Sequence, residues 1–466
     1  LFRSGGRCRK SSSSEYSLQE FNTDFRIGEL MNFLVIGSGA REHIIAEKLD
    51  IVGANVFSVL TNMNPGLLQI SKKYFFVNKY KTNMDAIVDF ALNNSINCVV
   101  IGPEDPLALG LSDLFWKKGI PVVGPLKELA QIETSKGFTR DLLNNYNIDV
   151  SPNYMRFNSM NGVKNFMDVL SGNYVVKFDG LMGGKGVKVS GEHLADINEG
   201  LKYCKSIINN SGTFVIEEKL VGEEFSLMSF CDGQNLAHMP AIQDHKRAYE
   251  GDIGPNTGGM GCYSDSNHSL PFLKEQEVYE AREINEKVAK ALFEHTGKNY
   301  KGILYGGFMV THKGVKLIEY NARFGDPEAM NLLTLLDSDF ASVCSNMVEG
   351  TLKSVIFRNE ATVCKYVVPK GYGSNPSVDT TLEVDELYRQ HSNLYYAAVN
   401  MDENGIISTT SSRAAAIVSS GKSISEAEEK CEKGLKHISG NNLFTRHDIA
   451  KPDLIQKRII NMETIR

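Results

Sequence analysis

Short apolar strands that alternate with helices through glycine turns fill the chain from residue 32 to residue 125. The strands are predicted at residues 33–36, 56–60, 98–101 and 122–123, and helical segments lie between them at residues 42–49 and 86–93. Parallel neighbouring strands need such crossover helices, because a tight hairpin can join only antiparallel strands. This part of the chain is therefore predicted to form a doubly wound parallel sheet.

The first of these strands ends in a glycine turn with the sequence GSGAREH at residues 37–43. A dinucleotide site needs a small third residue in this turn and an acid after the second strand, but Glu42 stands in the turn and residues 60–62 contain no acid. A carboxylate at a helix N-terminus repels a pyrophosphate but accepts hydrogen bonds from sugar hydroxyls. A sugar-phosphate site fits better, with Glu42 on the hydroxyls and nearby amides on the phosphate. A turn in which Glu42 only caps the helix is the alternative.

A second chemical signal lies at residues 315–328, where an alternating apolar strand runs into Glu319 and Asn321. Side chains two apart on a strand point to the same face, so these two oxygens converge on one point. Mg²⁺ usually takes one or two protein oxygens and keeps its other positions for water and phosphate. Arg323 follows on the same face, and a turn leaves Asp326 in a loop. A hairpin with residues 302–310 is expected to place this strand in the middle of a sheet. An edge strand with a solvated polar face is the alternative.

A glycine-rich hairpin is predicted between strands at residues 174–177 and 187–190. Four glycines within seven residues expose backbone N–H groups and allow movement, which suits a loop that closes over phosphates: Gly180, Gly183, Gly184 and Gly186. The segment lacks the Lys-Ser/Thr ending and the following helix of a P-loop, so it indicates another class of phosphate site, or a flexible hairpin without function. Lys136, in the first turn of a helix at residues 135–143, is by itself a surface lysine.

Two further segments carry polar clusters. Residues 214–224 form a strand exit whose backbone could meet an adenine edge while its acids bind a ribose. The sequence QDHKR at residues 243–247 precedes GPNTGGMG at residues 254–261, a loop of exposed amides that suits a small carboxylate or phosphate. From about residue 361 an α+β module follows without a cluster of His, Cys and acids, and we expect it to form a wall of the site.

Composition excludes several classes of function. The chain has 466 residues, enough for three or four units, and its apolar fraction of 42% and charged fraction of 23% are those of a soluble globular protein. A net charge of −6 gives no support for nucleic acid or membrane partners. No apolar run approaches the roughly 18 residues of a membrane-spanning helix. The eight cysteines are scattered without a C-x-x-C pair, which indicates a reducing compartment and a cytoplasmic location.

Residues 1–30 differ from the rest because they are basic, serine-rich and free of acids before Glu15. Such a segment is expected to be disordered and is typical of an organelle targeting leader, but a cloning artefact or an over-extended reading frame fits equally. We exclude it from the fold.

Taken in order, the motifs resemble the phosphoribosylamine–glycine ligases (glycinamide ribonucleotide synthetases), a purine-pathway family of the ATP-grasp superfamily. The resemblance covers about residues 31–466 and is thinner beyond residue 330. It rests on GSGAREH at 37–43, GPEDPL at 102–107, KFDGLMGGKGV at 177–187, IEEKLVGEEFS at 216–226, QDHKR at 243–247, GPNTGGMG at 254–261, LYGGFM at 304–309 and IEYNARFGDPE at 318–328.

The resemblance implies a multidomain α/β and α+β fold. It comprises a doubly wound substrate-binding domain at residues 31–130, an ATP-grasp domain at 131–345 with a mobile lid at about 150–222, and a small α+β domain at 346–466. The implied reaction joins glycine to 5-phosphoribosylamine with ATP and Mg²⁺ or Mn²⁺, through glycyl phosphate. The enzyme would be cytoplasmic and a monomer or weak homodimer. A related ATP-grasp carboxylase or formate-dependent transformylase is the alternative, but neither is expected to carry GPNTGGMG or QDHKR.

The resemblance also implies a role for each matching residue. The metal ligands would be Glu319 and Asn321, and the groups on the phosphates would be Lys136, Lys177, Arg323, Gly183, Gly184 and Gly186. The adenine and ribose would meet Glu217, Glu218, Leu220 and Glu224. Phosphoribosylamine would be held by Gly37, Gly39, Glu42, Asn64, Gly66 and Asp326, and glycine with its acyl phosphate would border Asn256, Gly258 and Gly259. The chain departs from the family pattern at Phe178 and Met182 in the lid, and at Ser411 and Ser412, where two glycines are common.

Overall fold

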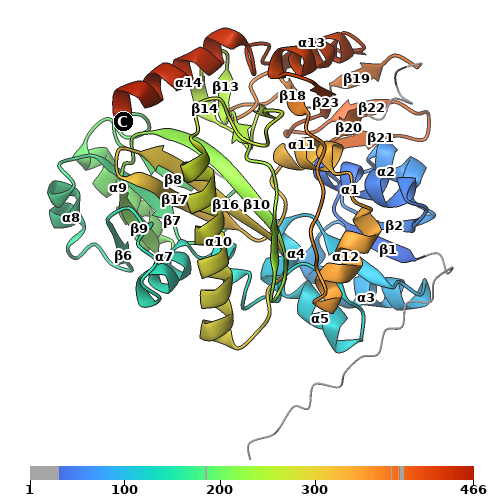
Figure 1. The fold of residues 1–466 in the computed structure, drawn as a ribbon, viewed down its shortest axis with the longest axis horizontal. Helices are drawn as coiled ribbons and strands as arrows, with labels where there is room; N and C mark the ends of the chain where they lie inside the picture. The colour runs from blue at the N-terminus through green and yellow to red at the C-terminus, as the bar shows by residue number, and fades with distance from the viewer. Residues whose placement is uncertain (1–30, 184–185, 379, 387, 389–392) are drawn as a thin grey trace, which may run out of the picture.

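The computed structural model describes residues 31–183, 186–378, 380–386, 388 and 393–466 (Figure 1). The leader at residues 1–30 and Gly184 of the glycine-rich hairpin therefore lie outside the described residues. No helix within these ranges combines the length and apolar character that crossing a membrane requires.

The N-terminal part is a five-stranded parallel sheet with the order β3-β2-β1-β4-β5. Its strands are β1 (Asn32–Ile36), β2 (Asn55–Leu60), β3 (Lys73–Phe76), β4 (Cys98–Ile101) and β5 (Val122–Val123), and its helices are α1 (Ala40–Ile51), α2 (Pro65–Ile70), α3 (Met84–Asn93), α4 (Glu104–Leu109) and α5 (Leu111–Lys117). The predicted parallel sheet is confirmed. Edge strand β3 was missed, because its residues are half-exposed or exposed and lack the apolar run of a buried strand. The order reverses between β1 and β4, where open parallel sheets usually bind ligands.

The central sheet is antiparallel, with the order β11-β10-β16-β17. Its strands are β10 (Glu223–Asp232), β11 (Leu236–His238), β16 (Lys301–Thr311) and β17 (Gly314–Asn321), and α6 (Gln131–Thr134), α7 (Lys136–Asn145) and α10 (Glu275–Thr296) pack against it. The predicted hairpin of β16 and β17 is confirmed. Its predicted place in the middle of a sheet is wrong, because β17 is the edge strand.

A small lobe with a hydrophobic core of its own covers one side of the central sheet. It contains β6 (Tyr154–Phe157), β7 (Tyr174–Phe178), β8 (Val187–Val189) and β9 (Phe214–Glu218), with α8 (Val163–Val169) and α9 (Ile197–Asn209). The predicted pairing of β7 with β8 around the glycine-rich segment is confirmed. Residues such as Phe157, Tyr174 and Phe214 pack among themselves and not into the main core. Figure 1 shows this lobe standing apart from the body of the molecule on the side opposite the N-terminal sheet.

The C-terminal part shares a sheet with the segment that precedes the GPNTGGMG loop. Strand β15 (Gly261–Ser264) pairs with β12 (Gln243–Asp244) on one side and with β18 (Ala361–Pro369) on the other. This sheet continues through β23 (Ala415–Gly421), β20 (Leu394–Tyr396) and β25 (Leu443–Thr445). The short strands β13 (Arg247–Tyr249) and β14 (Ile253–Asn256) form a hairpin of their own. The C-terminal module is thus continuous with the centre of the molecule.

The remaining elements complete the C-terminal part. The helices are α11 (Glu328–Leu335), α12 (Phe340–Glu349), α13 (Ile424–Leu435) and α14 (Pro452–Ile465), and the outer strands are β19 (Thr381–Val384), β21 (Val399–Met401), β22 (Ile407–Thr409) and β24 (Ile438–Ser439). Figure 1 shows α14 lying across the top of the molecule, above the β13–β14 hairpin.

Candidate active site

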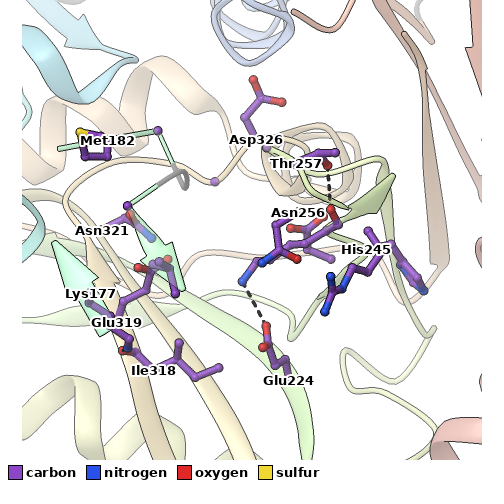
Figure 2. A pocket seen from close by; sticks show the side chains of 18 of the residues that line it. Lys177, Met182, Glu224, His245, Asn256, Thr257, Ile318, Glu319, Asn321 and Asp326 are labelled. Carbon is purple, nitrogen blue, oxygen red and sulfur yellow. Dashed lines mark hydrogen bonds and ion pairs between the residues drawn. The ribbon is translucent and has the colours of Figure 1, made fainter. Parts of the chain in front are cut away.

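A cavity of about 1140 Å³ lies where the N-terminal sheet, the small lobe, the central sheet and the C-terminal part meet. Charged side chains from all four parts line it, among them Arg41, Glu104, Lys136, Lys177, Glu218, Asp244, Glu319, Arg323, Asp326 and Arg413. Figure 2 shows Glu319 and Asn321 together on one side of this cavity, with Asn256, Thr257 and Asp326 on the other.

The end of β17 presents Glu319 and Asn321 to the cavity, as the two-residue spacing predicts. The amine of Lys136 lies 3.4 Å from the Glu319 carboxylate. Burial alone would raise the pKa of Glu319, but Lys136, Lys246, Lys177 and Arg323 lower it to about 2, so this group is ionised at neutral pH. One carboxylate and one amide oxygen fit a Mg²⁺ ion that completes its shell with phosphate and water. No larger cluster of His, Cys, Asp and Glu suited to a metal occurs among the described residues.

Lys177 is held in place by the neighbouring strands. Its amine lies 2.7 Å from the Glu217 carboxylate and donates a hydrogen bond of 3.0 Å to the carbonyl oxygen of Ile318. Ile318 is the extra residue of a bulge in β17, since its neighbours Leu317 and Glu319 pair with consecutive residues of β16. A bulge leaves a backbone group outside the ladder, and here that carbonyl also accepts from Arg140.

Glu217, predicted to meet the adenine, is paired with two cations in this structure. Its carboxylate is buried and receives two hydrogen bonds from Arg140, at 2.8 and 3.0 Å, besides the ion pair with Lys177. Burial would raise the pKa of Glu217, but the two cations lower it to about 2. This side chain therefore positions Lys177. Glu217 also borders the cavity, as do the other predicted nucleotide residues Glu218, Leu220 and Glu224 and the glycines Gly183 and Gly186.

Arg323 spans two acids that the sequence did not single out. Its guanidinium lies 3.0 Å from the Glu133 carboxylate and 3.5 Å from that of Glu104. Glu133 is buried and also accepts a hydrogen bond from the backbone of Ala322. Burial acts to lower the pKa of Arg323, but the two acids raise it, so the charge is fixed. Arg323 also donates to the side-chain oxygen of Asn321 at 3.4 Å, which connects the fixed charge to one of the two predicted metal ligands.

The GPNTGGMG segment forms a tight loop on the opposite wall. Gly254, Gly259 and Gly261 have φ values of 85°, 110° and 154°, which glycine adopts most readily. A Cβ on Gly259 would lie 2.5 Å from the ring of Pro327, so this glycine also permits the close approach of two loops. Asn256 and Gly258 line the cavity, while Gly259 lies just behind its wall.

Arg413 of the C-terminal part ties these loops together, although the sequence did not mark it as a site residue. It forms an ion pair of 2.9 Å with Asp326 and donates to the carbonyl oxygens of Gly258 and Asp326, each at 2.7 Å. It also stacks over the ring of Tyr366, which donates to the other carboxylate oxygen of Asp326. The predicted wall-forming module therefore supplies a buried charge to the site. A lone Arg after two serines gives no sequence signal of such a contact.

The N-terminal turn lies behind the cavity wall in this structure. Glu42 is buried, and its carboxylate accepts a 2.6 Å hydrogen bond from the backbone of Gly39 at the start of α1 and another from Arg41. A Cβ on Gly37 or Gly102 would fall within 2.5 Å of this side chain, so the glycines make room for it. The capping alternative thus describes Glu42 as found. Neither Gly37, Gly39 nor Glu42 is among the residues that line the cavity.

Asn64 and Gly66 also make packing and hydrogen-bond contacts within the protein. The buried Asn64 side chain caps α2 and donates to the carbonyl oxygens of Ser38 and Tyr396, and a Cβ on Gly66 would overlap the ring of His43. Binding of a sugar phosphate by these two residues would require the exchange of contacts that join the N-terminal sheet to the C-terminal part.

Comparison with known proteins gives one consistent result. The chain matches three family models: phosphoribosylglycinamide synthetase, N domain, over residues 31–133; its ATP-grasp (A) domain over 134–329; and its C domain over 362–452. It is 43% identical to the phosphoribosylamine–glycine ligase of Methanosarcina barkeri over 440 residues, which cover 94% of this chain and 100% of the relative. The corresponding ligase of Methanothermobacter thermautotrophicus is 45% identical over 442 residues, with the same coverage.

Solved structures agree on the fold. The crystal structure of phosphoribosylamine–glycine ligase from Thermotoga maritima matches 90% of this chain and 100% of its own with a TM-score of 0.76 at 24% identity. A biotin carboxylase from Campylobacter jejuni matches 92% of this chain and 97% of its own, with a TM-score of 0.69 at 14% identity. At such identities the likeness concerns the arrangement of the chain and not its substrates.

Proposed function

Because the chain belongs to the phosphoribosylglycinamide synthetase family, we propose that the cavity around Glu319 carries out the family's ligation in a single chamber. The enzyme joins glycine to phosphoribosylamine in purine biosynthesis. The observation that carries the proposed site is the convergence of Lys136, Lys177 and Arg323 on the carboxylate and amide at the end of β17.

The reaction needs two transfers that both involve the carboxyl group of glycine: a phosphoryl transfer to its oxygen and then an acyl transfer from its carbon. A carboxylate oxygen of glycine attacks the terminal phosphorus of ATP, the bond to the bridging oxygen breaks, and ADP leaves with that electron pair. The neutral amine of phosphoribosylamine then attacks the glycyl carbonyl carbon, phosphate leaves, and the nitrogen loses a proton as the amide forms. Lys136, Lys177 and Arg323 oppose the negative charge on the transferring phosphoryl oxygens, which is the main contribution a protein makes to such a step. No protein nucleophile is required.

The side chains at the end of β17 fit a divalent metal cofactor. Glu319 and Asn321 would hold Mg²⁺ or Mn²⁺, which supplies positive charge against the phosphate oxygens of ATP. Glu319 is already ionised before a metal binds, and the hydrogen bond from Arg323 already orients the side-chain oxygen of Asn321.

The nucleotide is proposed to lie between the small lobe and the central sheet. Glu218 ends β9 at the cavity edge and Leu220 follows it, while Glu224 lies on β10, where Lys246 donates to it at 3.1 Å. The lobe at about residues 150–222 would act as the lid, with Gly183 and Gly186 over the phosphates. Phosphoribosylamine is proposed to enter from the N-terminal side, where Arg41, Glu104 and Asp326 line the cavity.

We further propose domains at residues 31–130, 131–345 and 346–466, a cytoplasmic location, and a monomer or weak homodimer without nucleic acid or membrane partners. The buried, unpaired state of all cysteines in the described ranges supports a reducing compartment.

One assay tests the function. Purified protein is given ATP, Mg²⁺ and glycine, with and without phosphoribosylamine made in situ, and ADP release is followed. Release that requires both co-substrates supports the proposal. Release that requires bicarbonate or formate instead would contradict it and favour a carboxylase or transformylase.

A further inference from the structure

Asp244, at the end of β12, is an acid of the cavity wall for which the mechanism above has no use. It lines both the main cavity and the recess that extends from it toward Glu319. Its Oδ1 atom is buried and has no hydrogen-bond partner within the described residues. The same atom lies 2.7 Å from the point where a Cβ on Gly259 would stand, so the GPNTGGMG loop packs directly against this carboxylate. An ionised oxygen buried without a partner is costly unless a ligand supplies one.

The cations near Asp244 are all engaged elsewhere. Lys246 pairs with Glu224, and Arg413 pairs with Asp326. Across the recess, Lys136 pairs with Glu319. Among the described residues that line the cavity, Asp244 and Glu328 are acids without an ion pair, and Glu328 accepts a hydrogen bond from Tyr305. One corner of a strongly charged cavity therefore holds two acids whose nearby cations form ion pairs with other groups.

The pKa of Asp244 agrees with this geometry. Burial and the nearby Glu328 raise it well above the usual range, and Lys246 and Arg413 only partly oppose the shift. A positively charged ligand group next to Asp244 would offset both the burial and the repulsion from Glu328.

We propose that Asp244 binds the ammonium group of glycine and so selects an amino acid over other small carboxylic acids. The inference rests on the proposed function. Of the three substrates, glycine alone must bring a positive charge, because ATP and the sugar phosphate are anionic and the attacking amine has to be neutral. The carboxylate of glycine has to reach the phosphoryl group near Glu319, and Asp244 lines the same small recess as Glu319. A glycine molecule can therefore present its two ends to these two regions at once.

The assignment also explains selectivity. A carboxylic acid without an amine, such as glycolate, would leave Asp244 buried and unpaired. Sites built around a buried polar group reject ligands that lack the matching group by large factors.

The experiment compares wild type with Asp244→Asn, which keeps the shape and removes the charge. We expect the KM for glycine to rise at least about tenfold, as for loss of one partner of a buried charge pair, while the KM for ATP changes by less than about twofold. The discrimination against glycolate, measured as the ratio of kcat/KM values for ADP release, should fall in parallel. Asp265→Asn is the matched control, because that aspartate caps a turn and does not line the cavity.

A second readout separates a binding role from a structural one. Glycine with a non-hydrolysable ATP analogue should raise the melting temperature of wild type but not that of Asp244→Asn, whose unliganded melting temperature and circular dichroism report whether it folds. A folded variant with unchanged glycine KM, or one still protected by glycine, would overturn the inference. Wild-type protein without ADP release dependent on glycine and phosphoribosylamine would instead overturn the proposed function. If Asp244→Asn does not fold, Asp244→Ser is tested in the same way.

Discussion

The guanidinium of Arg413 lies 2.9 Å from the carboxylate of Asp326, and this contact joins the C-terminal part to the loop that follows β17. The same guanidinium holds the carbonyl oxygen of Gly258 in the facing loop. Two loops from different places in the sequence are thus fixed relative to each other by one side chain of a third segment. The geometry of the cavity thus depends on Arg413, which contacts neither the two lysines proposed to bind the phosphates nor the predicted metal ligands.

Replacing Arg413 by Lys should show this dependence. Lysine keeps the charge but cannot reach the carboxylate and two carbonyl oxygens at once, since its donors radiate from a single atom. We expect kcat/KM for phosphoribosylamine to fall by about 10- to 100-fold, as for the loss of about 1.4–2.8 kcal/mol of positioning. Steady-state kinetics of ADP release measure the effect.

The KM for ATP serves as the internal control for Arg413→Lys, because the adenine and ribose region lies at the other end of the cavity. An equal rise in the KM for all three substrates would mean that the variant is globally altered and that Arg413 does not act on the loops selectively.

Replacing Glu217 by Gln should mainly affect stability. The change leaves Arg140 and Lys177 buried without their shared carboxylate, and breaking a buried ion pair in this way costs about 3–5 kcal/mol. Urea unfolding at pH 7 measures the loss. Glu218→Gln is the matched control, since that side chain lies at the exposed edge of the cavity and should change stability by less than about 1 kcal/mol.

The pH dependence of unfolding provides an independent check on Glu217. Its pKa of about 2 in the folded protein lies below the usual value of 4.5, so its contribution is present above pH 4.5 and is lost as the pH falls toward 2. Such a shift corresponds to stability on the order of 3 kcal/mol. The Glu217→Gln variant should lose less stability than wild type across this window, and parallel curves for the two proteins would contradict the assigned pKa.

Sequence reasoning found the groups that follow from local rules and missed those that depend on long-range packing. The strand period placed Glu319 and Asn321 on one face, and that face does line the cavity. The place of β17 at a sheet edge was only the alternative expectation, because no local rule fixes the order of strands in a sheet. The Ile318 bulge was missed, because the cations that satisfy its carbonyl come from other segments. Strand β3 was missed because an exposed edge strand has no continuous apolar run.

The charged residues were the hardest to assign from the sequence. Glu217 and Glu42 have the chemistry of ligand-binding acids, but folding pairs the first with Arg140 and turns the second onto the backbone of Gly39. Arg413 was not marked as a site residue, and Asp244 was covered only as part of the QDHKR motif, since their roles depend on which partners other segments leave to them. The spacing of residues in the sequence predicts which side chains share a face of one strand or helix. It does not predict which charges stay unpaired once distant segments have packed together.

Glu192 links the small lobe to the body of the molecule, and its removal should weaken lid closure. Its carboxylate pairs with Arg247 of β13 and lies 3.0 Å from Lys219. Because these groups are partly exposed, the pairs are worth about 0.2–1 kcal/mol, and Glu192→Gln should raise the KM for ATP by about 1.5- to 5-fold. Asp168→Asn removes another ion pair of the lobe, internal to α8, and should leave the KM unchanged. Equal KM values for ATP in Glu192→Gln and wild type would show that the contact does not stabilise the closed state.

Glu319→Gln and Asn321→Asp test the metal site itself. The first removes the carboxylate that Lys136 and its neighbours keep ionised, and the second changes the amide that Arg323 contacts. Both should lower turnover, and Glu319→Gln should raise the Mg²⁺ concentration for half-maximal activity at least about tenfold, since Mg²⁺ binds chiefly through carboxylate oxygen. The melting temperature should change by only a few degrees, because the Glu319 side chain lines the cavity, with 28% of its surface exposed, and does not pack in the core. Titration of ADP release with Mg²⁺ measures the effect, and an unchanged Mg²⁺ dependence in both variants would remove these two residues from the site.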